Sequence, residues 1–184
     1  MKNILKKFVL ALTLMVGLMS ISGVADEVKA QSAQEILKPN SSVNLYPAIN
    51  TDMLLTLDIG GREGNIVALW ERTWSGNTYV PQQNWKIEYD KTKGDNVVLI
   101  RNLYNNSVLT WDYYGTRSII GQPHNYSTRQ YWVVEPIGDY FVFRSYYNRN
   151  YALTVPAAPH YNGEGITVYP YSGDRYQMFS NHAI

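Results

Sequence analysis

Short segments in which apolar and polar residues alternate recur along the chain from about residue 41 onward. In a half-buried strand every second side chain faces the core, so this alternation predicts β-strands. Turn-forming residues separate the segments, as at Gly60-Gly61 and Asn105-Asn106. No stretch after the N-terminal region keeps the period of a helix. The pattern therefore predicts an all-β domain.

Two short signatures recur three times in the same order. The first is a Leu-Thr pair inside a strand segment, found at Leu55-Thr56-Leu57, Leu109-Thr110-Trp111 and Leu153-Thr154-Val155. The second is a Gln-x-aromatic triplet, found at Gln83-Asn84-Trp85, Gln130-Tyr131-Trp132 and Gln177-Met178-Phe179. The glutamines are spaced 47 residues apart in both intervals. A fixed interval of this size is typical of a repeat architecture.

Each repeat contains four short strand segments, and in the first repeat they cover residues 43–46, 55–57, 66–70 and 85–89. The repeats run over about 41–90, 91–137 and 138–184. A propeller requires at least four blades. Three four-stranded units can instead close into one barrel capped by hairpins, which removes free sheet edges. We therefore predict a β-trefoil over residues 41–184.

The N-terminal region has the features of a signal peptide. Three lysines precede an apolar stretch over residues 8–19, and small residues at signal-cleavage spacing end at Ala30 or, alternatively, at Ala25. We expect cleavage after residue 30 and a secreted, extracellular protein; the alternative is a membrane anchor or a buried N-terminal helix. Residues 31–40 are polar and show no strand pattern, so they are expected to form a flexible arm.

Charge and composition narrow the range of partners. The chain has 16 basic and 15 acidic residues, and it stays near neutral when residues 1–30 are removed. This balance argues against nucleic acid or an anionic membrane as the main partner. The lack of cysteine excludes Cys-ligated zinc and thiol catalysis. The 16 tyrosines and five tryptophans suit both strands and sugar-binding surfaces, so composition leaves these two explanations open.

The Gln-x-Trp signature on a three-fold repeat resembles the ricin-type β-trefoil lectin family, over about residues 41–184. The resemblance implies that Trp85, Trp132 and Phe179 are core residues. It also implies one shallow sugar pocket in each repeat. Each pocket would contain an Asp after the Leu-Thr strand, an aromatic on the third strand, and an amide before or within Gln-x-Trp. The carboxylate accepts from sugar hydroxyls, the amide donates and accepts, and the ring packs on the apolar sugar face.

The first repeat matches this family pattern best. Asp58 follows the Leu-Thr strand, Trp70 takes the aromatic position, and Gln82 and Gln83 take the amide positions. The repeat departs from the pattern at Ala68, where many members have a polar side chain.

The other two repeats match less completely. The second keeps Asp112 and Gln130, but its aromatic position falls on Pro123, with His124 or Tyr126 of the same loop as substitutes. The second repeat therefore departs from the family pattern at its aromatic position.

The third repeat keeps Tyr169 and Gln177 but has Pro156 in place of the aspartate. Proline supplies no carboxylate acceptor, so we expect a degenerate third site.

No residue pattern indicates catalysis, a metal or a cofactor. The three histidines share no metal-ligand spacing and no triad motif, and there is no phosphate-binding loop. Asp112 and Glu135 are a conceivable pair of hydrolytic carboxylates, but we interpret them as solvated surface acids.

The sequence thus predicts a secreted, non-catalytic lectin whose partners are glycans or glycoproteins. By resemblance, the ligand is of the galactose or N-acetylgalactosamine type. The alternative is the cell-binding subunit of a secreted toxin whose toxic partner is a separate chain. A trefoil protease inhibitor that presents residues 155–159 as bait is a less favoured alternative. No transmembrane segment is expected in the mature chain.

Overall fold

The computed structural model describes residues 31–60, 65–75, 78–112, 117–157 and 161–184. The predicted signal peptide lies outside these residues. Within them, no helix is long and apolar enough to cross a membrane.

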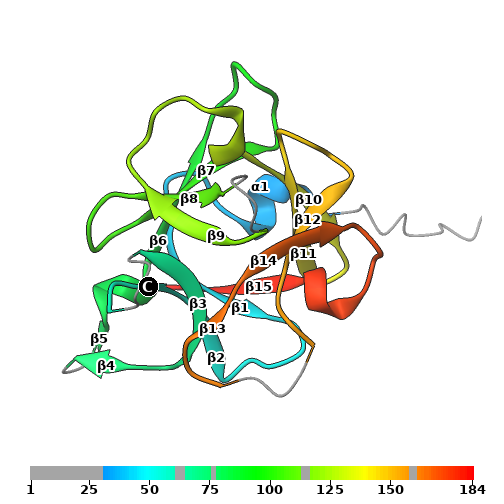
Figure 1. Ribbon diagram of the computed structural model, residues 1–184. Helices are drawn as coiled ribbons and strands as arrows, with labels where there is room; N and C mark the ends of the chain where they lie inside the picture. The colour runs from blue at the N-terminus through cyan, green and yellow to red at the C-terminus, as the bar shows by residue number, and fades with distance from the viewer. Residues whose placement is uncertain (1–30, 61–64, 76–77, 113–116, 158–160) are drawn as a thin grey trace, which may run out of the picture.

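Twelve strands form three successive groups of four, as the repeat pattern predicts (Figure 1). The first repeat contains β1 (Ser42–Pro47), β2 (Met53–Asp58), β3 (Ile66–Glu71) and β6 (Trp85–Tyr89). The second contains β7 (Val97–Asn102), β8 (Val108–Trp111), β9 (Ile119–Gln122) and β10 (Trp132–Ile137). The third contains β11 (Tyr140–Ser145), β12 (Tyr151–Thr154), β14 (Thr167–Pro170) and β15 (Phe179–Ala183).

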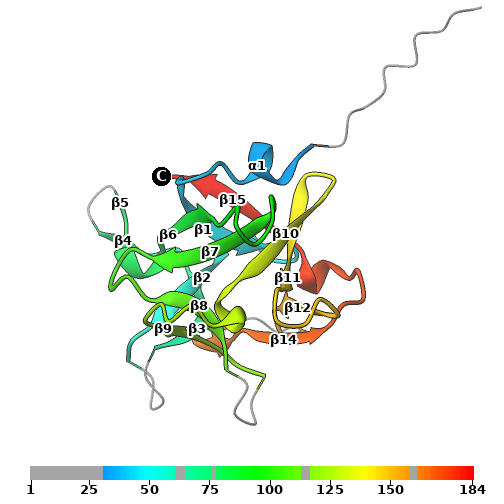
Figure 2. The same cartoon turned by 90° about the horizontal axis from the view of Figure 1, so that it is seen from above.

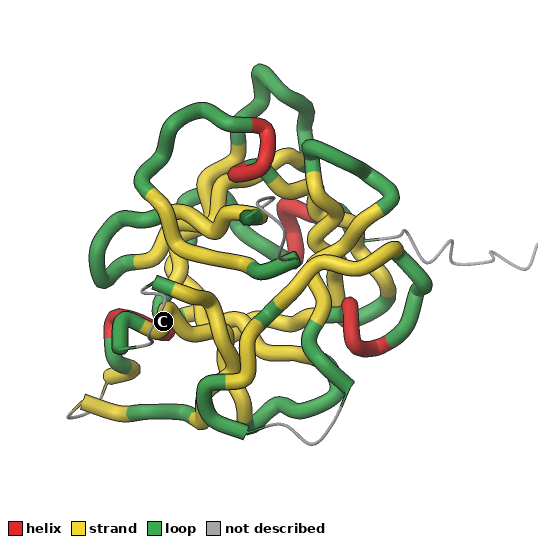
Figure 3. Tube along the Cα trace, viewed as in Figure 1, coloured by secondary structure: helices red, strands yellow, loops and turns green. Residues whose placement is uncertain are grey.

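Shorter elements lie between these strands. A 3-10 turn comes before the last strand of every repeat, and the three turns are set apart around the periphery (Figure 3). They are η1 (Pro81–Gln83), η2 (Thr128–Gln130) and η3 (Arg175–Gln177). The remaining short strands are β4 (Trp74–Ser75), β5 (Thr78–Tyr79) and β13 (Glu164–Gly165).

The first and last strands of the repeats close into a six-stranded antiparallel barrel. β1 pairs with β6, β6 with β7, β7 with β10, β10 with β11, β11 with β15, and β15 again with β1. The middle strands form the hairpins β2–β3, β8–β9 and β12–β14. β3, β9 and β14 gather at one end of the barrel (Figure 2). A closed barrel with three capping hairpins is the predicted β-trefoil architecture.

The aromatic residues of the three triplets are in the core, as predicted. Trp85, Trp132 and Phe179 are each 0% exposed and belong to one continuous hydrophobic cluster. The indole Nε1 of Trp85 donates to the Leu55 carbonyl at 2.9 Å, and that of Trp132 donates to the Leu109 carbonyl at 3.0 Å. These bonds join the two sequence signatures of one repeat to each other.

The threonines and glutamines of the signatures are joined in the same way. The Nε2 atoms of Gln83, Gln130 and Gln177 donate to Thr56, Thr110 and Thr154 at 3.3, 3.3 and 3.1 Å, respectively. Each threonine hydroxyl donates to the carbonyl two residues earlier. The two signatures therefore recur together because they are the two ends of one buried hydrogen-bond network.

The expectation of a flexible arm over residues 31–40 is wrong for its middle part. α1 (Ala33–Ile36) is a helical turn that begins with a capping box between Ser32 and Glu35. Ala33 and Leu37 are buried in the main core, and α1 lies at the barrel end away from β3, β9 and β14 (Figure 2). The physical reason is that Ala33 and Leu37 bury apolar surface at this end of the barrel, which stabilises the turn there.

Candidate functional site

The pairing of the hairpin strands shows which positions correspond in the three repeats. The leucines of the three Leu-Thr signatures, Leu55, Leu109 and Leu153, pair with Leu69, Gly121 and Val168, respectively. The next residue along the third strand is Trp70 in the first repeat, Gln122 in the second and Tyr169 in the third. The prediction that the second repeat has Pro123 at this position is therefore wrong by one residue. The strand register, which the sequence spacing did not fix, decides it.

The first repeat brings all four of its predicted site residues to one pocket. A cavity of about 260 Å³ is lined by Asp58, Trp70, Gln82 and Gln83, together with residues of β2 and of the segment before η1. Asp58 Oδ1 accepts from the Gly60 amide at 2.9 Å, so this carboxylate also caps a turn. The pocket thus combines a carboxylate, a ring and an amide.

Among the residues that the structure describes, two polar atoms of side chains that line this pocket are buried and have no hydrogen-bond partner. They are the Trp70 indole Nε1, a donor, and the Gln82 Oε1, an acceptor. Buried polar groups in native proteins are nearly always paired, so such a pair calls for an explanation. The indole N–H can donate to a ligand oxygen, and the amide oxygen can accept from a ligand hydroxyl.

The third repeat is hydrogen-bonded to the strand that carries Trp70. The Gly163 amide donates to the Leu69 carbonyl at 2.9 Å, and Asn162 Oδ1 accepts from the Glu71 amide at 2.7 Å. Gly163 has a φ of +87°, and a Cβ there would lie 3.7 Å from Trp70 Cζ2. This loop therefore fixes the position of Trp70 through the strand that carries it.

The glutamines of the triplets are placed differently from the prediction. Gln83 and Gln130 are 0% exposed and Gln177 is 2% exposed. Beyond its bond to threonine, each Nε2 donates to a backbone carbonyl, of Glu71, Pro123 and Pro170, respectively. Each Oε1 accepts from a backbone amide, of Thr73, Asn125 and Ser172. Both hydrogens of each amide are used internally, so the geometry makes these glutamines structural and does not support them as sugar ligands.

The second repeat has a pocket of about 340 Å³ that contains Asp112 and Gln122. No aromatic residue of β9 lines it. Tyr147, from the turn after β11, lines it instead, with its ring edge-on to Trp111 at 5.7 Å between centroids. The Arg129 guanidinium lies 5.3 Å from the centre of the Tyr147 ring. The predicted substitutes His124 and Tyr126 do not line this pocket.

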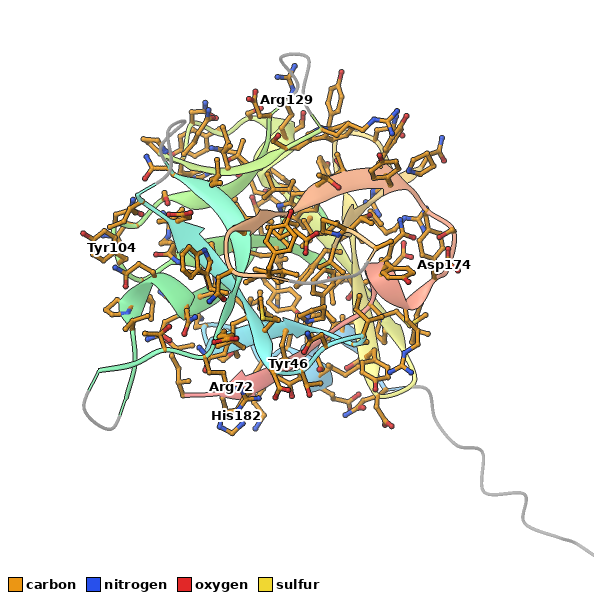
Figure 4. The ribbon with its side chains drawn as sticks, turned by 60° about the horizontal axis from the view of Figure 1, so that its bottom comes forward. Tyr46, Arg72, Tyr104, Arg129, Asp174 and His182 are labelled. Carbon is orange, nitrogen blue, oxygen red and sulfur yellow. The ribbon has the colours of Figure 1, made fainter. Side chains whose placement is uncertain are left out.

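The third repeat has a larger pocket, of about 650 Å³, and Tyr169 lines it next to Pro156. Asp174 and Tyr176 complete the wall, so a carboxylate is present despite the proline. The Arg117 guanidinium lies 4.8 Å from the centre of the Tyr169 ring. Arg129 and Asp174, from the second and third pockets, lie at separate edges of the molecule (Figure 4).

Sequence reasoning missed Gln122, Arg129, Tyr147, Asp174 and Tyr176 as pocket residues. The turn at Ser172-Gly173-Asp174 was the only signal for Asp174. No local signal could have found Tyr147, because it reaches the second pocket from the third repeat.

The two carboxylates considered as a hydrolytic pair, Asp112 and Glu135, do not share a pocket. Glu135 lies on a barrel strand with its Oε2 3.3 Å from the Arg144 guanidinium, and it does not line the pocket of Asp112. In the part of the chain that the structure describes, no three metal-ligating side chains gather.

No protein-family model matches the chain, and no curated protein matches it. Solved structures are similar in fold. One is a mosquitocidal holotoxin, with a TM-score of 0.69 and 23% identity; the match covers 83% of this chain and 17% of the holotoxin chain. A second is the Polyporus squamosus lectin bound to the human-type influenza-binding epitope, with a TM-score of 0.63 and 14% identity over 79% of this chain and 50% of the lectin chain.

A third similar structure is the BEL β-trefoil, with a TM-score of 0.61 and 10% identity; the match covers 81% of this chain and 97% of that one. Glycosidases are also among the similar structures, and there this chain again corresponds to a minor part of a longer protein. At these identities the likeness establishes the β-trefoil fold and nothing finer.

Proposed function

We propose that this protein is a secreted, non-catalytic lectin for glycans of the galactose or N-acetylgalactosamine type. The observation that carries the proposal is the first-repeat pocket, where Asp58, Trp70 and Gln82 converge. A sugar ring packs its apolar face on Trp70 while its hydroxyls bond with Asp58 and with the unpartnered atoms of Trp70 and Gln82.

The second and third pockets are weaker candidates. The second has a carboxylate, an amide and Tyr147, which comes from the third repeat. The third has Tyr169 but lacks the aspartate after its Leu-Thr strand. A shallow site offers a monosaccharide few contacts, so useful affinity arises when two sites bind one branched glycan together.

The test is a glycan array followed by calorimetry on the wild type, Asp58→Ala and Asp52→Ala. Asp52 is an exposed aspartate of the same repeat that does not line the pocket, so it is the matched control. Hydrogen bonds to a charged group contribute about 1.5–3 kcal/mol, so Asp58→Ala should weaken binding about tenfold to hundredfold. Asp52→Ala should bind as the wild type does. A folded wild type that binds no glycan would sink the proposal.

A second candidate function is that of the cell-binding component of a secreted toxin. The similarity to a small part of a mosquitocidal holotoxin favours it. The toxic activity would then reside in another polypeptide. Affinity capture from culture supernatant on the immobilised mature chain tests this, and recovery of no partner there would count against it.

The protease-inhibitor alternative has less support. Val155, the first residue of the proposed bait segment, is 1% exposed and belongs to the core cluster. Residues 158 and 159 of that segment lie outside the described residues.

The lysine-rich, apolar N-terminus supports the proposal of secretion, which mass spectrometry of the exported protein tests directly. We expect a mature N-terminus at Gln31. An exported chain that still carries Met1 would contradict cleavage.

A further inference from the structure

The loop between β9 and η2 presents alternate residues to two different cavities. Asn125 and Ser127 line the second-repeat pocket. His124 and Tyr126 line a separate groove of about 800 Å³, together with Tyr131. The other walls of the groove are the segment from Gln34 to Asn40 and the turn between β6 and β7. No residue of the three repeat pockets lines this groove.

Tyr126 is in an unusual backbone conformation for its residue type. Its φ is +63°, and the other three non-glycine residues with positive φ in the described chain are all asparagines. Asparagine tolerates the left-handed region, whereas for a bulky residue such a φ is an outlier. The Tyr126 side chain is 76% exposed, so core packing does not explain why a tyrosine is kept there.

The neighbouring residues hold Tyr126 in this conformation. The Asn125 amide donates to Gln130 Oε1 at 2.9 Å, and Asn125 Oδ1 accepts from the Ser127 amide at 3.0 Å. The buried glutamine of the second repeat thus fixes the loop on one side, and the asparagine closes the turn across Tyr126. A strained residue held from both sides is a common feature of binding sites.

The ring of Tyr126 lies against that of His124, with 4.4 Å between the ring centroids and 47° between the ring planes, and we call this pair of rings the Tyr126–His124 platform. His124 Nε2 is 3.2 Å from the Tyr131 hydroxyl, and Tyr131 also hydrogen-bonds with the Asp90 carboxylate. Hydrogen bonding from Thr92 lowers the pKa of Asp90, while burial raises the pKa of Tyr131. The Tyr131 hydroxyl therefore lies within hydrogen-bonding distance of a carboxylate on one side and of the His124 ring on the other. These contacts position the His124 side of the platform.

The charges around the groove are mixed. Lys93 Nζ lies 4.7 Å from the centre of the Tyr131 ring, next to the acidic Asp90. Glu88 is paired with Arg101 at 2.9 Å and with Lys86 at 3.4 Å, so it adds little free charge. Such a surface lacks the concentrated positive charge that a nucleic acid requires. A carboxylate, amides and an exposed aromatic platform instead match the alternating hydroxyl and C–H faces of a sugar.

We propose that this groove is an additional saccharide-binding surface, in which a sugar ring packs on the Tyr126–His124 platform and its hydroxyls bond with Asp90 and the Asn40 amide. The inference takes its ligand class from the proposed carbohydrate binding. It adds a site that lies outside the three repeat pockets. The groove is larger than the first-repeat pocket, about 800 Å³ against 260 Å³, so its ligand is an oligosaccharide.

The informative variant is Tyr126→Asn, because it should change stability and binding in opposite directions. Asparagine tolerates the left-handed backbone, so the melting temperature should rise by about 2–4 °C. Removal of the ring should weaken oligosaccharide binding by about fivefold or more. The control is Tyr104→Asn, which removes an exposed tyrosine of the β7–β8 turn that lines none of these cavities.

The probes are immobilised oligosaccharides ending in galactose or N-acetylgalactosamine, applied to the wild type, Asp58→Ala, Tyr126→Asn and the double variant. We expect Asp58→Ala to keep part of the binding and the double variant to lose it. If Tyr126→Asn binds the oligosaccharides as well as the wild type does, the proposal of a saccharide site in the groove is overturned, and the proposed first-repeat site is unaffected. The proposal is also overturned if the groove binds a peptide or protein and the glycan profile of Tyr126→Asn equals that of the wild type. A wild type that binds none of the probes overturns the proposed function as well.

Discussion

At the scale of single residues, neighbours in sequence have opposite roles. Gln83 is fully buried and its amide is used in three hydrogen bonds, whereas the adjacent Gln82 has an unpartnered Oε1 in the first-repeat pocket. The resemblance assigned an amide role to this pair without separating its members. The separation depends on which side chain points inward from η1, and sequence spacing does not determine that.

Because of this difference, we expect substitution of Gln83 to lower stability and substitution of Gln82 to weaken glycan binding. Gln83→Ala leaves the Thr73 amide and the Glu71 carbonyl without their partner, and should cost about 2–4 kcal/mol in the free energy of unfolding. Gln82→Ala should change that free energy by less than about 0.5 kcal/mol but weaken glycan binding. Urea unfolding and calorimetry on both variants provide the measurements. The reverse assignment, with Gln82 stabilising and Gln83 not, would refute this division of roles.

At the scale of elements, the strands could be predicted and the short connections could not. Period-two alternation and the Leu-Thr and Gln-x-aromatic signatures located the twelve main strands, because each signature is part of a buried network. The turn α1 was missed since four residues are too short to show a helical period. The third-strand position in the second repeat was misplaced by one, at Pro123 instead of Gln122, because a loop of variable length precedes it.

The attachment of α1 gives a prediction for alkaline pH. The Tyr89 hydroxyl donates to the Leu37 carbonyl at 3.0 Å, and burial raises the pKa of Tyr89 from 10.0 to about 12. Between these values the folded state keeps a proton that the unfolded state has lost. This contribution is therefore complete below pH 10 and is lost as the pH rises toward 12.

Melting curves of the wild type and Tyr89→Phe over this range test the effect. The melting temperature of Tyr89→Phe should fall less steeply with pH than that of the wild type. Parallel pH profiles for the two proteins would show that Tyr89 does not titrate as described.

At the scale of the whole molecule, the three repeats share the same barrel and core, but the residues that line their pockets differ. The barrel, the core aromatics and the glutamine network recur in every repeat, except that Phe179 has no indole N–H. The pockets differ because the frame does not require their residues. The first has the aspartate and the aromatic together, the second borrows Tyr147, and the third has Pro156.

The most direct test of the central claim uses the indole N–H signals of the five tryptophans. In a nitrogen–proton NMR titration with a galactose-terminated oligosaccharide, the Trp70 indole signal should shift, because its N–H is unpartnered in the proposed pocket. The signals of Trp85 and Trp132 should stay in place, since their N–H groups are buried and bonded to carbonyls. A folded protein that binds the oligosaccharide without any shift at Trp70 would contradict the account.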